Sequence, residues 1–158
     1  MMKRFCLILA ALVLLGAGCA SAEQRVQLPE SRYAVTLPDG MTYDGPGEKG
    51  EAAFAYVSEA LGLDVSFTVG YAGGLQQISD LIPAIEQKGM TDVRMTLVNG
   101  IEMLVYRYEP EDTNSMKCIG YILRDGDKVE QIEFWYAGQG AADLTRTIME
   151  SIGDTGAL

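Results

Sequence analysis

The residue types that carry chemistry are few in this chain, and one absence excludes several mechanisms. The sequence contains no histidine among its 158 residues. Without an imidazole, neither a Ser-His-Asp triad nor a Cys-His pair can form, and most zinc sites lose a usual ligand. The sequence also contains no P-loop and no G-x-G-x-x-G fingerprint. Acid–base chemistry would therefore have to use carboxylates.

Glu133 and Glu102 are the best candidates for a pair of working carboxylates. Glu133 lies in a strand-like run beside Trp135, and we expect Glu102 on a neighbouring strand. Two carboxylates that flank a cleft could hydrolyse a glycosidic bond. Exposed glutamates on strands are usually solvated surface residues, however. The sequence therefore assigns no catalytic residue, and a carboxylate hydrolase is the least favoured of its functions.

Aromatic residues suggest a binding surface instead. Tyr43 lies in a Gly-rich segment, Tyr71 follows Gly70, and Trp135 follows Glu133 by two positions. Aromatic side chains are enriched at recognition sites, although they are also ordinary residues of sheets. We take Tyr43, Tyr71, Glu133 and Trp135 as the candidate binding surface.

Two acidic segments, 109–114 and 125–127, offer oxygen ligands for calcium. Neither fits an EF-hand loop, because the required Gly and distal Glu are missing after Asp112 and Asn114. Turn chemistry accounts for the second segment. Segment 70–74 precedes a helix but matches no phosphate fingerprint. We expect no metal and no cofactor.

The N-terminus has the pattern of a removable bacterial secretion signal. Residues 3–4 are basic, residues 5–15 form an apolar run too short to span a membrane, and residues 20–22 read A-x-A. This order predicts a signal peptide over residues 1–22 and one domain over residues 23–158.

Cys19 gives an alternative end to the signal. Segment 15–19 resembles a bacterial lipobox, in which Cys19 would be lipidated, but Gly16 stands where Leu is usual. The A-x-A pattern favours release after Ala22 and a secreted protein. Lipidation at Cys19 would instead anchor the domain at the cell envelope.

Composition limits the partners of the mature chain. Without residues 1–22 the chain has ten Lys and Arg against 22 Asp and Glu, a net charge of −12. Such acidity disfavours nucleic acid and anionic membranes. Cys118 is then the single cysteine, so no internal disulfide can form. Its apolar neighbours indicate an inert buried residue.

The first half of the domain alternates strand patterns with turns. We expect strands over 33–37, 53–58 and 64–71, and a short leading strand over 25–28. Residues 38–51 are rich in Gly and are expected to form the longest loop.

A helix is expected next, from an apolar stripe that ends at Gly89. Pro83 allows two interpretations, which the sequence does not separate. Either Pro83 kinks one long helix, or it lies in the first turn of a shorter helix capped by Ser79 or Asp80.

The second half carries two hairpin signals and a final helix. Asn99-Gly100 between alternating runs predicts a type I′ turn, and Asp125-Gly126 joins strands over 116–124 and 129–136. An even-numbered loop places one apolar face on the second hairpin, formed by Ile119, Tyr121, Leu123, Ile132, Phe134 and Tyr136. The final helix spans 141–152 and ends at Gly153.

The fold class is therefore α+β, in the order β-β-β-α-β-β-β-β-α. We expect an antiparallel sheet of about six or seven strands, packed like a sandwich with two main helices. Three features carry a family resemblance: the opening Tyr33-Ala-Val-Thr-Leu-Pro38, the NG hairpin followed by the DG hairpin, and Gln131-Ile-Glu-Phe-Trp-Tyr136 before a helix that closes with Ile148-Met-Glu-Ser-Ile152. In these features the chain resembles the PsbP-like superfamily, which includes the photosystem II extrinsic subunit and a small Ran-binding import factor.

The resemblance implies a secreted bacterial member of that superfamily and a non-enzymatic binding or accessory domain. It transfers no functional residue, because each shared feature is structural and fold alone does not give function. We expect a module that engages a protein partner at the cell envelope through a sheet face and the loop after strand 33–37. The alternative is a binder of a small molecule or of cell-wall carbohydrate.

Overall fold

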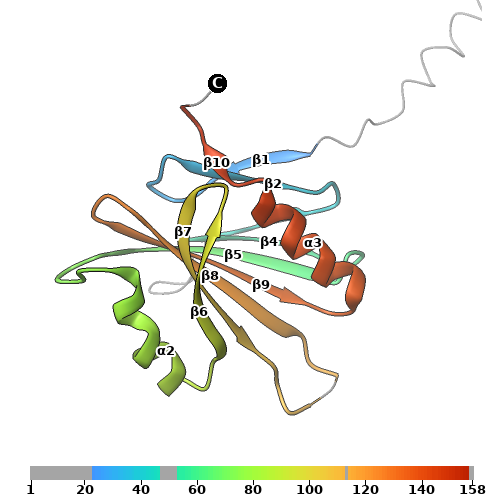
Figure 1. Cartoon of the computed structure of the whole chain (residues 1–158). Helices are drawn as coiled ribbons and strands as arrows, with labels where there is room; N and C mark the ends of the chain where they lie inside the picture. Colours follow the sequence, from blue (N-terminus) through green and yellow to red (C-terminus); the bar gives the residue numbers. More distant parts are fainter. Residues whose placement is uncertain (1–22, 47–52, 113, 157–158) are drawn as a thin grey trace, which may run out of the picture.

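The computed structural model describes residues 23–46, 53–112 and 114–156 (Figure 1). These residues form two antiparallel sheets with helices packed against them, so the α+β class and the sandwich arrangement are confirmed. The strands are β1 (Gln24–Gln27), β2 (Tyr33–Leu37), β3 (Thr42–Gly45), β4 (Phe54–Ser58), β5 (Leu63–Tyr71), β6 (Thr91–Val98), β7 (Ile101–Tyr108), β8 (Lys117–Asp125), β9 (Lys128–Tyr136) and β10 (Gly153–Asp154). The helices are the 3-10 turn η1 (Ile78–Leu81), α2 (Ile82–Gln87) and α3 (Gln139–Glu150). Within the described ranges no helix is long and apolar enough to cross a membrane.

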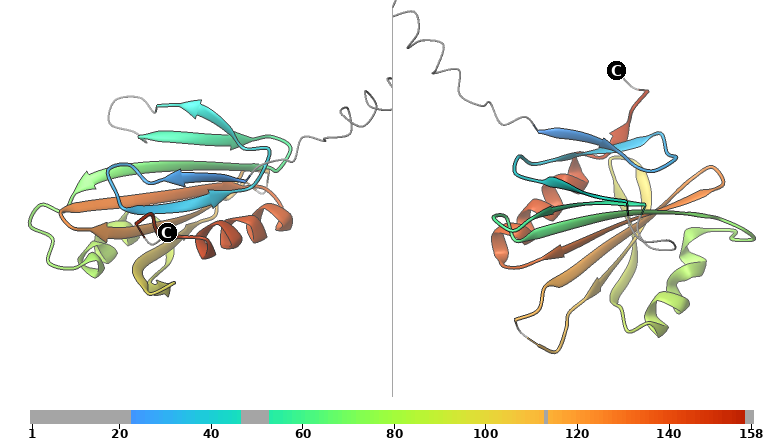
Figure 2. Two further views of the ribbon diagram at one scale, coloured as in Figure 1. Left: turned by 90° about the horizontal axis from the view of Figure 1, so that it is seen from above. Right: turned by 180° about the vertical axis from the view of Figure 1, so that it is seen from behind.

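The large sheet has seven strands in the order β3-β4-β5-β9-β8-β7-β6, and the small sheet has the order β1-β2-β10. In Figure 1 the small sheet crosses the top of the molecule, with α3 at the right and α2 at the lower left. The right view in Figure 2, from behind, also places β1 and β10 together at the top, away from α2.

The two faces of the large sheet bury different clusters. One face, which we call the α3 face, packs against the small sheet and α3, and its core includes Val35, Phe67, Phe134 and Ile148. The opposite face, which we call the α2 face, packs against η1 and α2 through a smaller cluster of Ile78, Leu104, Tyr106 and Ile122. Because side chains alternate along a strand, β7, β8 and β9 contribute to both clusters.

The first predicted hairpin is confirmed, with a turn of the expected kind. Asn99 has φ 50° and Gly100 has φ 80°, the positive values that a type I′ turn requires. Val98 pairs with Ile101, so Asn99 and Gly100 alone join β6 to β7.

The second hairpin has the predicted register but a different turn. Ile119 pairs with Phe134, which places the predicted apolar residues on the α3 face. Asp125 pairs with Lys128 and so belongs to β8. The turn is therefore Gly126-Asp127, one residue later than Asp125-Gly126.

One expected loop and the expected end of the final helix contain strands instead. The segment 38–51 includes β3, whose backbone pairs with β4 at the edge of the large sheet. At the other end of the chain, α3 stops at Glu150, and Gly153 does not cap it. Gly153 belongs to β10 and pairs with Ala34 of β2, so the chain enters the small sheet shortly after α3 ends.

The shorter-helix interpretation of Pro83 is the correct one. Pro83 lies in the first turn of α2, where its missing N–H costs no hydrogen bond. Ser79 and Asp80 do not cap α2, because both lie in η1. Asp80 instead accepts a hydrogen bond from the backbone N–H of Gln77, at 3.0 Å.

The predicted signal peptide over residues 1–22, including Cys19, lies before the first described residue. Residues 47–52 of the expected loop also lie outside the described part of the chain. Secretion, cleavage after Ala22 and lipidation at Cys19 therefore remain predictions.

Candidate functional site

A cavity of about 420 Å³ lies between α2 and the large sheet. We call it the α2 cavity. Its walls are apolar, with Leu81 and Ile85 on the helix side and Ile122 and Val129 on the sheet side. Its polar groups gather on the sheet, which forms the floor, and they are Thr68, Tyr106, Gln131 and Glu133. An apolar chamber with a few convergent polar groups is the usual form of a ligand site.

The register of three strands brings Tyr106 and Glu133 together. Tyr106 of β7 pairs with Gly120 of β8, and Gly120 pairs with Glu133 of β9. The phenol therefore crosses β8 and donates a hydrogen bond to Oε1 of Glu133, at 2.5 Å. Gly120 is required for this crossing, because a Cβ at Gly120 would lie 2.1 Å from Cζ of Tyr106.

Gln131 completes the polar floor. Its Nε2 donates to the Tyr106 hydroxyl at 2.6 Å and to Oε1 of Glu133 at 3.0 Å. The amide must turn its nitrogen toward Glu133, because an ionised carboxylate only accepts hydrogen bonds. Burial and the nearby charge of Glu133 both raise the pKa of Tyr106, so its hydroxyl keeps its proton. The carboxylate is thus held in place by two donors.

Cys118 lies beneath the same face and is 1% exposed. Burial, and then the negative charge of Glu133, raise the pKa of its thiol to about 12. The thiol is protonated at neutral pH and is therefore a poor nucleophile, as expected of an inert buried cysteine.

The four residues of the predicted binding surface do not form one surface. Glu133 lines the α2 cavity, and Tyr71 lies at its rim, 74% exposed, with the Lys128 ammonium 3.7 Å from its ring centre. Trp135 shares the α2 face, where its ring meets that of Tyr108 edge-on at 6.2 Å.

Tyr43 lies on the opposite face of the large sheet from Glu133. It pairs with Tyr56, and the two rings are 5.5 Å apart on the α3 face. By strand alternation Tyr71 lies on the same side of β5 as Phe67, the α3 face. Of the four residues, the structure thus brings Glu133 and Trp135 to the α2 face and places the rings of Tyr43 and Tyr71 on the other face.

The expected carboxylate pair of Glu102 and Glu133 is not formed. Glu102 lies on β7, which β8 separates from β9, so the two residues are not on neighbouring strands. The β7 residue in line with Glu133 is Tyr106, four positions along the strand from Glu102. Four strand residues span about 13 Å, which places Glu102 beyond one end of the floor.

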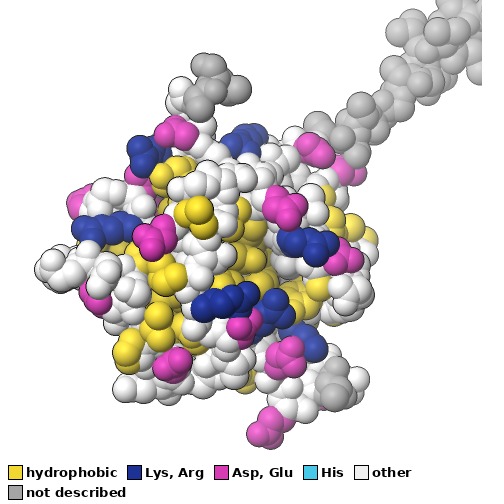
Figure 3. All heavy atoms as spheres, viewed as in Figure 1, with side chains coloured by type: hydrophobic (Ala, Val, Ile, Leu, Met, Phe, Trp, Pro, Cys, Tyr) yellow, Lys and Arg dark blue, Asp and Glu magenta, His cyan; other side chains and the backbone are white. Residues whose placement is uncertain are grey.

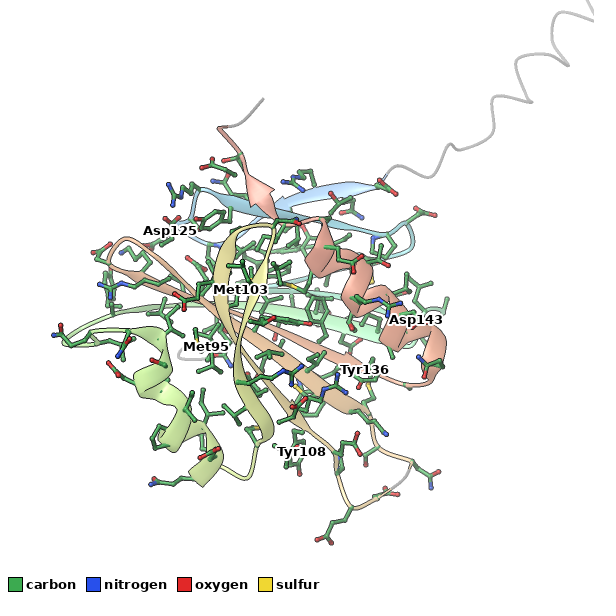
Figure 4. All side chains as sticks on the ribbon, in the orientation of Figure 1. Met95, Met103, Tyr108, Asp125, Tyr136 and Asp143 are labelled. Atoms are coloured by element: carbon green, nitrogen blue, oxygen red, sulfur yellow. The ribbon has the colours of Figure 1, made fainter. Side chains whose placement is uncertain are left out.

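Asp125 has a structural role that differs from simple turn formation. Its Oδ2 accepts hydrogen bonds from Ser31 Oγ and from the backbone N–H of Arg32, both at 2.8 Å. Its Oδ1 lies 3.3 Å from Nε of Arg32. Asp125 thus fastens the β1–β2 turn to the end of β8, where Figure 4 labels it. Across the described residues no group of three or more His, Cys, Asp or Glu could hold a metal ion.

A second, more polar hollow of about 500 Å³ lies on the α3 face, between the large sheet and α3. Figure 3 shows Lys and Arg side chains beside Asp and Glu on the side of the molecule where Figure 4 labels Tyr136 and Asp143. The pairs are Arg107–Asp92 at 3.2 Å, Lys117–Glu109 at 3.3 Å and Arg146–Asp143 at 3.5 Å. Because these basic groups already have acidic partners, the hollow has little net charge for a ligand.

Glu130 is a buried acid that sequence reasoning missed. Its side chain is fully buried, and neither carboxylate oxygen has a hydrogen-bond partner in the described structure. Burial raises its pKa to about 8, with further contributions from Asp125 and Glu30. Its position two residues before Ile132, on the same predicted face, was the signal that could have identified it.

Comparison with known proteins identifies the fold. No family model and no curated protein sequence matches the chain. Sixteen chains of solved structures match it in structure. One is the solution structure of cyanobacterial PsbP (CyanoP) from Synechocystis sp. PCC 6803, with a TM-score of 0.66 and 12% identity over 88% of this chain and 96% of that one. Another is a 1.50 Å crystal structure from Bacteroides thetaiotaomicron VPI-5482, with a TM-score of 0.56 and 12% identity.

The domain therefore has a PsbP-like fold, which confirms the resemblance inferred from the sequence. The match to the Bacteroides structure covers 85% of this chain but 48% of that one, so this chain spans about half of its length. An identity of 12% supports the fold and transfers no site residue.

Proposed function

We propose that this protein is a non-enzymatic accessory module that binds a partner protein outside the cytoplasm, at the cell envelope. The α2 face is its contact surface, and a side chain of the partner enters the α2 cavity. The observation that carries this proposal is the cavity itself, with the carboxylate of Glu133 held at its floor by Tyr106 and Gln131.

The composition of the cavity supports binding over catalysis. Glu133 is the single acidic residue among the described residues that line it. General acid–base hydrolysis needs a second group to exchange protons with the first. The thiol of Cys118 stays protonated, so it does not serve as a nucleophile.

The surroundings of the cavity support a protein partner. Trp135 and Tyr108 are half-buried and pack edge-on, so they extend the α2 face with aromatic surface. Aromatic residues contribute much of the binding energy in protein interfaces. The predicted secretion signal over residues 1–22 is the reason to place this partner outside the cytoplasm.

A capture experiment with matched baits tests the proposal. All described helices and strands lie within residues 24–154, so the chain from Glu23 onward retains the described fold and serves as bait. Ala84→Trp fills the cavity mouth at an exposed position that tolerates a larger side chain. Tyr43→Ala is the control, because it removes an exposed ring from the opposite face.

We expect an envelope protein to bind the wild-type bait and the Tyr43→Ala bait at near-stoichiometric yield, and to be lost from the Ala84→Trp bait. The reverse pattern would show that the α2 face is not the contact surface. Turnover of a substrate that stops on substitution of Glu133 would refute the non-enzymatic assignment.

A free small molecule is the second candidate occupant, and the size of the cavity favours it. A volume of about 420 Å³ lies within the range typical of small-molecule sites. Cell-wall glycans are one such ligand, because sugars stack on aromatic rings, and Trp135 lies on the same sheet face as the cavity although it does not line it. Trp135 is the only tryptophan and lies two residues from Glu133, so a change in its fluorescence on titration with a glycan panel would report binding on this face.

A further inference from the structure

We infer that the α2 cavity takes a cationic head, an ammonium or a guanidinium, carried on an apolar stem. This inference rests on the proposed function and names the chemistry of the group that enters the cavity. It follows from the hydrogen-bonding capacity that remains on the cavity floor once the internal bonds are counted.

The internal bonds use every hydrogen that Tyr106 and Gln131 can donate from their side chains. The Tyr106 hydroxyl has one hydrogen, which it gives to Glu133. The amide of Gln131 has two hydrogens, and its nitrogen donates to Tyr106 and to Glu133. The pair therefore has no donor left for a ligand.

The capacity that remains is for accepting hydrogen bonds. Both bonds to Glu133 end on Oε1, and within the described residues no bond reaches its Oε2 or the Oε1 of Gln131. Thr68 adds a hydroxyl, which can donate or accept. A floor made mainly of acceptors, one of them charged, is complementary to a ligand with several N–H donors and a positive charge.

The walls select what is attached to that head. Leu81 and Ile85 face the sheet residues Ile122 and Val129 across the cavity, so a bound stem is surrounded by apolar atoms. Burying an apolar stem contributes about 25 cal/mol per Å² of surface removed from water. A linear chain of several methylenes with a terminal cation fits both the walls and the floor.

Lys88 sets the direction of entry. It lines the rim and is exposed, and it is the only basic residue among the described lining residues. A cation that stayed at the rim would be repelled by Lys88, whereas a cation at the floor meets Glu133. Removing the charge of Lys88 should therefore tighten the binding of cations.

Hexylammonium and hexylguanidinium are suitable probes, with 1-hexanol and hexanoate as matched neutral and anionic controls. Binding is measured by NMR shift titration of the wild-type chain. We expect both cations to shift the cavity residues, hexanol to bind at least about tenfold more weakly, and hexanoate not to bind, because a charge-assisted bond is about twice as strong as a neutral one.

Two variants test which charges of the protein control the binding of the cationic probe. Glu133→Gln should weaken hexylammonium binding at least about tenfold, and Lys88→Gln should strengthen it. Glu86→Gln is the control, since Glu86 is an exposed residue of α2 that does not line the cavity, and it should leave binding unchanged. The comparison of probes on the wild-type chain needs no variant, so it stands even if Glu133→Gln unfolds the domain.

A peptide pair distinguishes a free amine from a partner's side chain. Leu-Leu-Arg-Leu-Leu is compared with the same peptide carrying citrulline, which keeps the shape of arginine and removes its charge. Stronger binding of the arginine peptide than of hexylguanidinium indicates a partner's side chain as the source, and weaker binding indicates a free amine or guanidine.

The inference is overturned if hexanoate or hexanol binds as tightly as hexylammonium, if hexylammonium does not bind at millimolar concentration, or if a folded Glu133→Gln chain binds it unchanged. The proposed function fails separately, when Ala84→Trp leaves partner capture intact. A partner that is lost from Ala84→Trp but retained by Glu133→Gln would refute the binding of a cationic head. It would still support the α2 face as the contact surface.

Discussion

The ring of Tyr106 occupies the space in which a side chain on Gly120 would lie. A Cβ at Gly120 would approach Cζ of Tyr106 to 2.1 Å and its hydroxyl oxygen to 2.3 Å. The glycine therefore acts as a gap in β8, through which β7 and β9 are joined by a side-chain hydrogen bond.

Gly120→Ala should destabilise the domain by about 3 kcal/mol, since the buried ring of Tyr106 must move and its bond to Glu133 is broken. Chemical denaturation measures the loss. Gly70→Ala is the control, because Gly70 lies in β5 with no atom within 4 Å of an added Cβ. Equal effects of the two substitutions would refute the role of the gap.

Glu130 should make the domain less stable as pH rises. Its pKa is about 8 in the folded chain, above the ordinary value of 4.5, so the folded state holds more protons than the unfolded state between these values. Stability then falls with rising pH over that window, by up to about 1.4 kcal/mol per pH unit, and levels off above it. The free energy of unfolding at pH 5.5, 7 and 8.5 measures the slope.

Glu130→Gln removes the titrating group and keeps its shape, so its stability should vary less with pH than that of the wild type. Glu102→Gln removes an exposed carboxyl of the same kind and should leave the slope unchanged. Identical slopes in the wild type and Glu130→Gln would show that Glu130 does not retain its proton.

Asn99 should stabilise the domain beyond its role in the β6–β7 turn. Its Nδ2 donates to the backbone oxygens of Glu150 and Ile152, at 2.7 Å and 2.9 Å, and so attaches the β6–β7 turn to the end of α3. Asn99→Gly keeps the turn geometry but loses both bonds, at a cost of about 1–2 kcal/mol. Asn99→Asp should cost more, because it places a carboxylate against two carbonyl oxygens. Thermal denaturation measures the stability of both variants. An Asn99→Asp variant as stable as the wild type would contradict the proposed contacts.

Asp125→Ala should loosen β1 and β2 without unfolding the large sheet. The substitution removes the acceptor for Ser31 Oγ and for the N–H of Arg32. We expect faster amide hydrogen exchange in β1 and β2 and unchanged exchange in β8 and β9. Asp127→Ala is the control, because this exposed turn residue contributes its backbone oxygen, which the substitution keeps. Similar amide exchange rates in both variants would show that Asp125 does not hold β1 and β2 in place.

The sequence predicted well where structure depends on neighbours in the chain. The Asn99-Gly100 turn and the pairing of Ile119 with Phe134 follow from local turn chemistry and alternation, and both are confirmed. β3 and β10 were missed because each is four residues or fewer, and because β3 is held by pairing with β4 and β10 by pairing with β2. Neither Thr42–Gly45 nor Gly153–Asp154 contains the alternation of apolar and polar residues that marks a strand.

The α2 cavity was beyond sequence reasoning because it depends on the order of strands in the sheet. Glu133 was identified as a candidate, but its expected partner was Glu102. Its observed partner, Tyr106, follows from placing β8 between β7 and β9. Gly120 inside a strand pattern was the available signal, since a glycine there often marks a close approach.

The small sheet makes the first and last strands of the domain neighbours of the same strand, β2. β1 can pair with β2 as soon as that hairpin is synthesised, whereas β10 follows every other described helix and strand. Pairing β10 with β2 closes a loop that contains most of the domain, and this has an entropic cost that local contacts do not have. Until Gly153 and Asp154 pair with β2, one edge of that strand therefore stays unpaired, and a chain truncated before Gly153 would expose this edge to pairing with another chain.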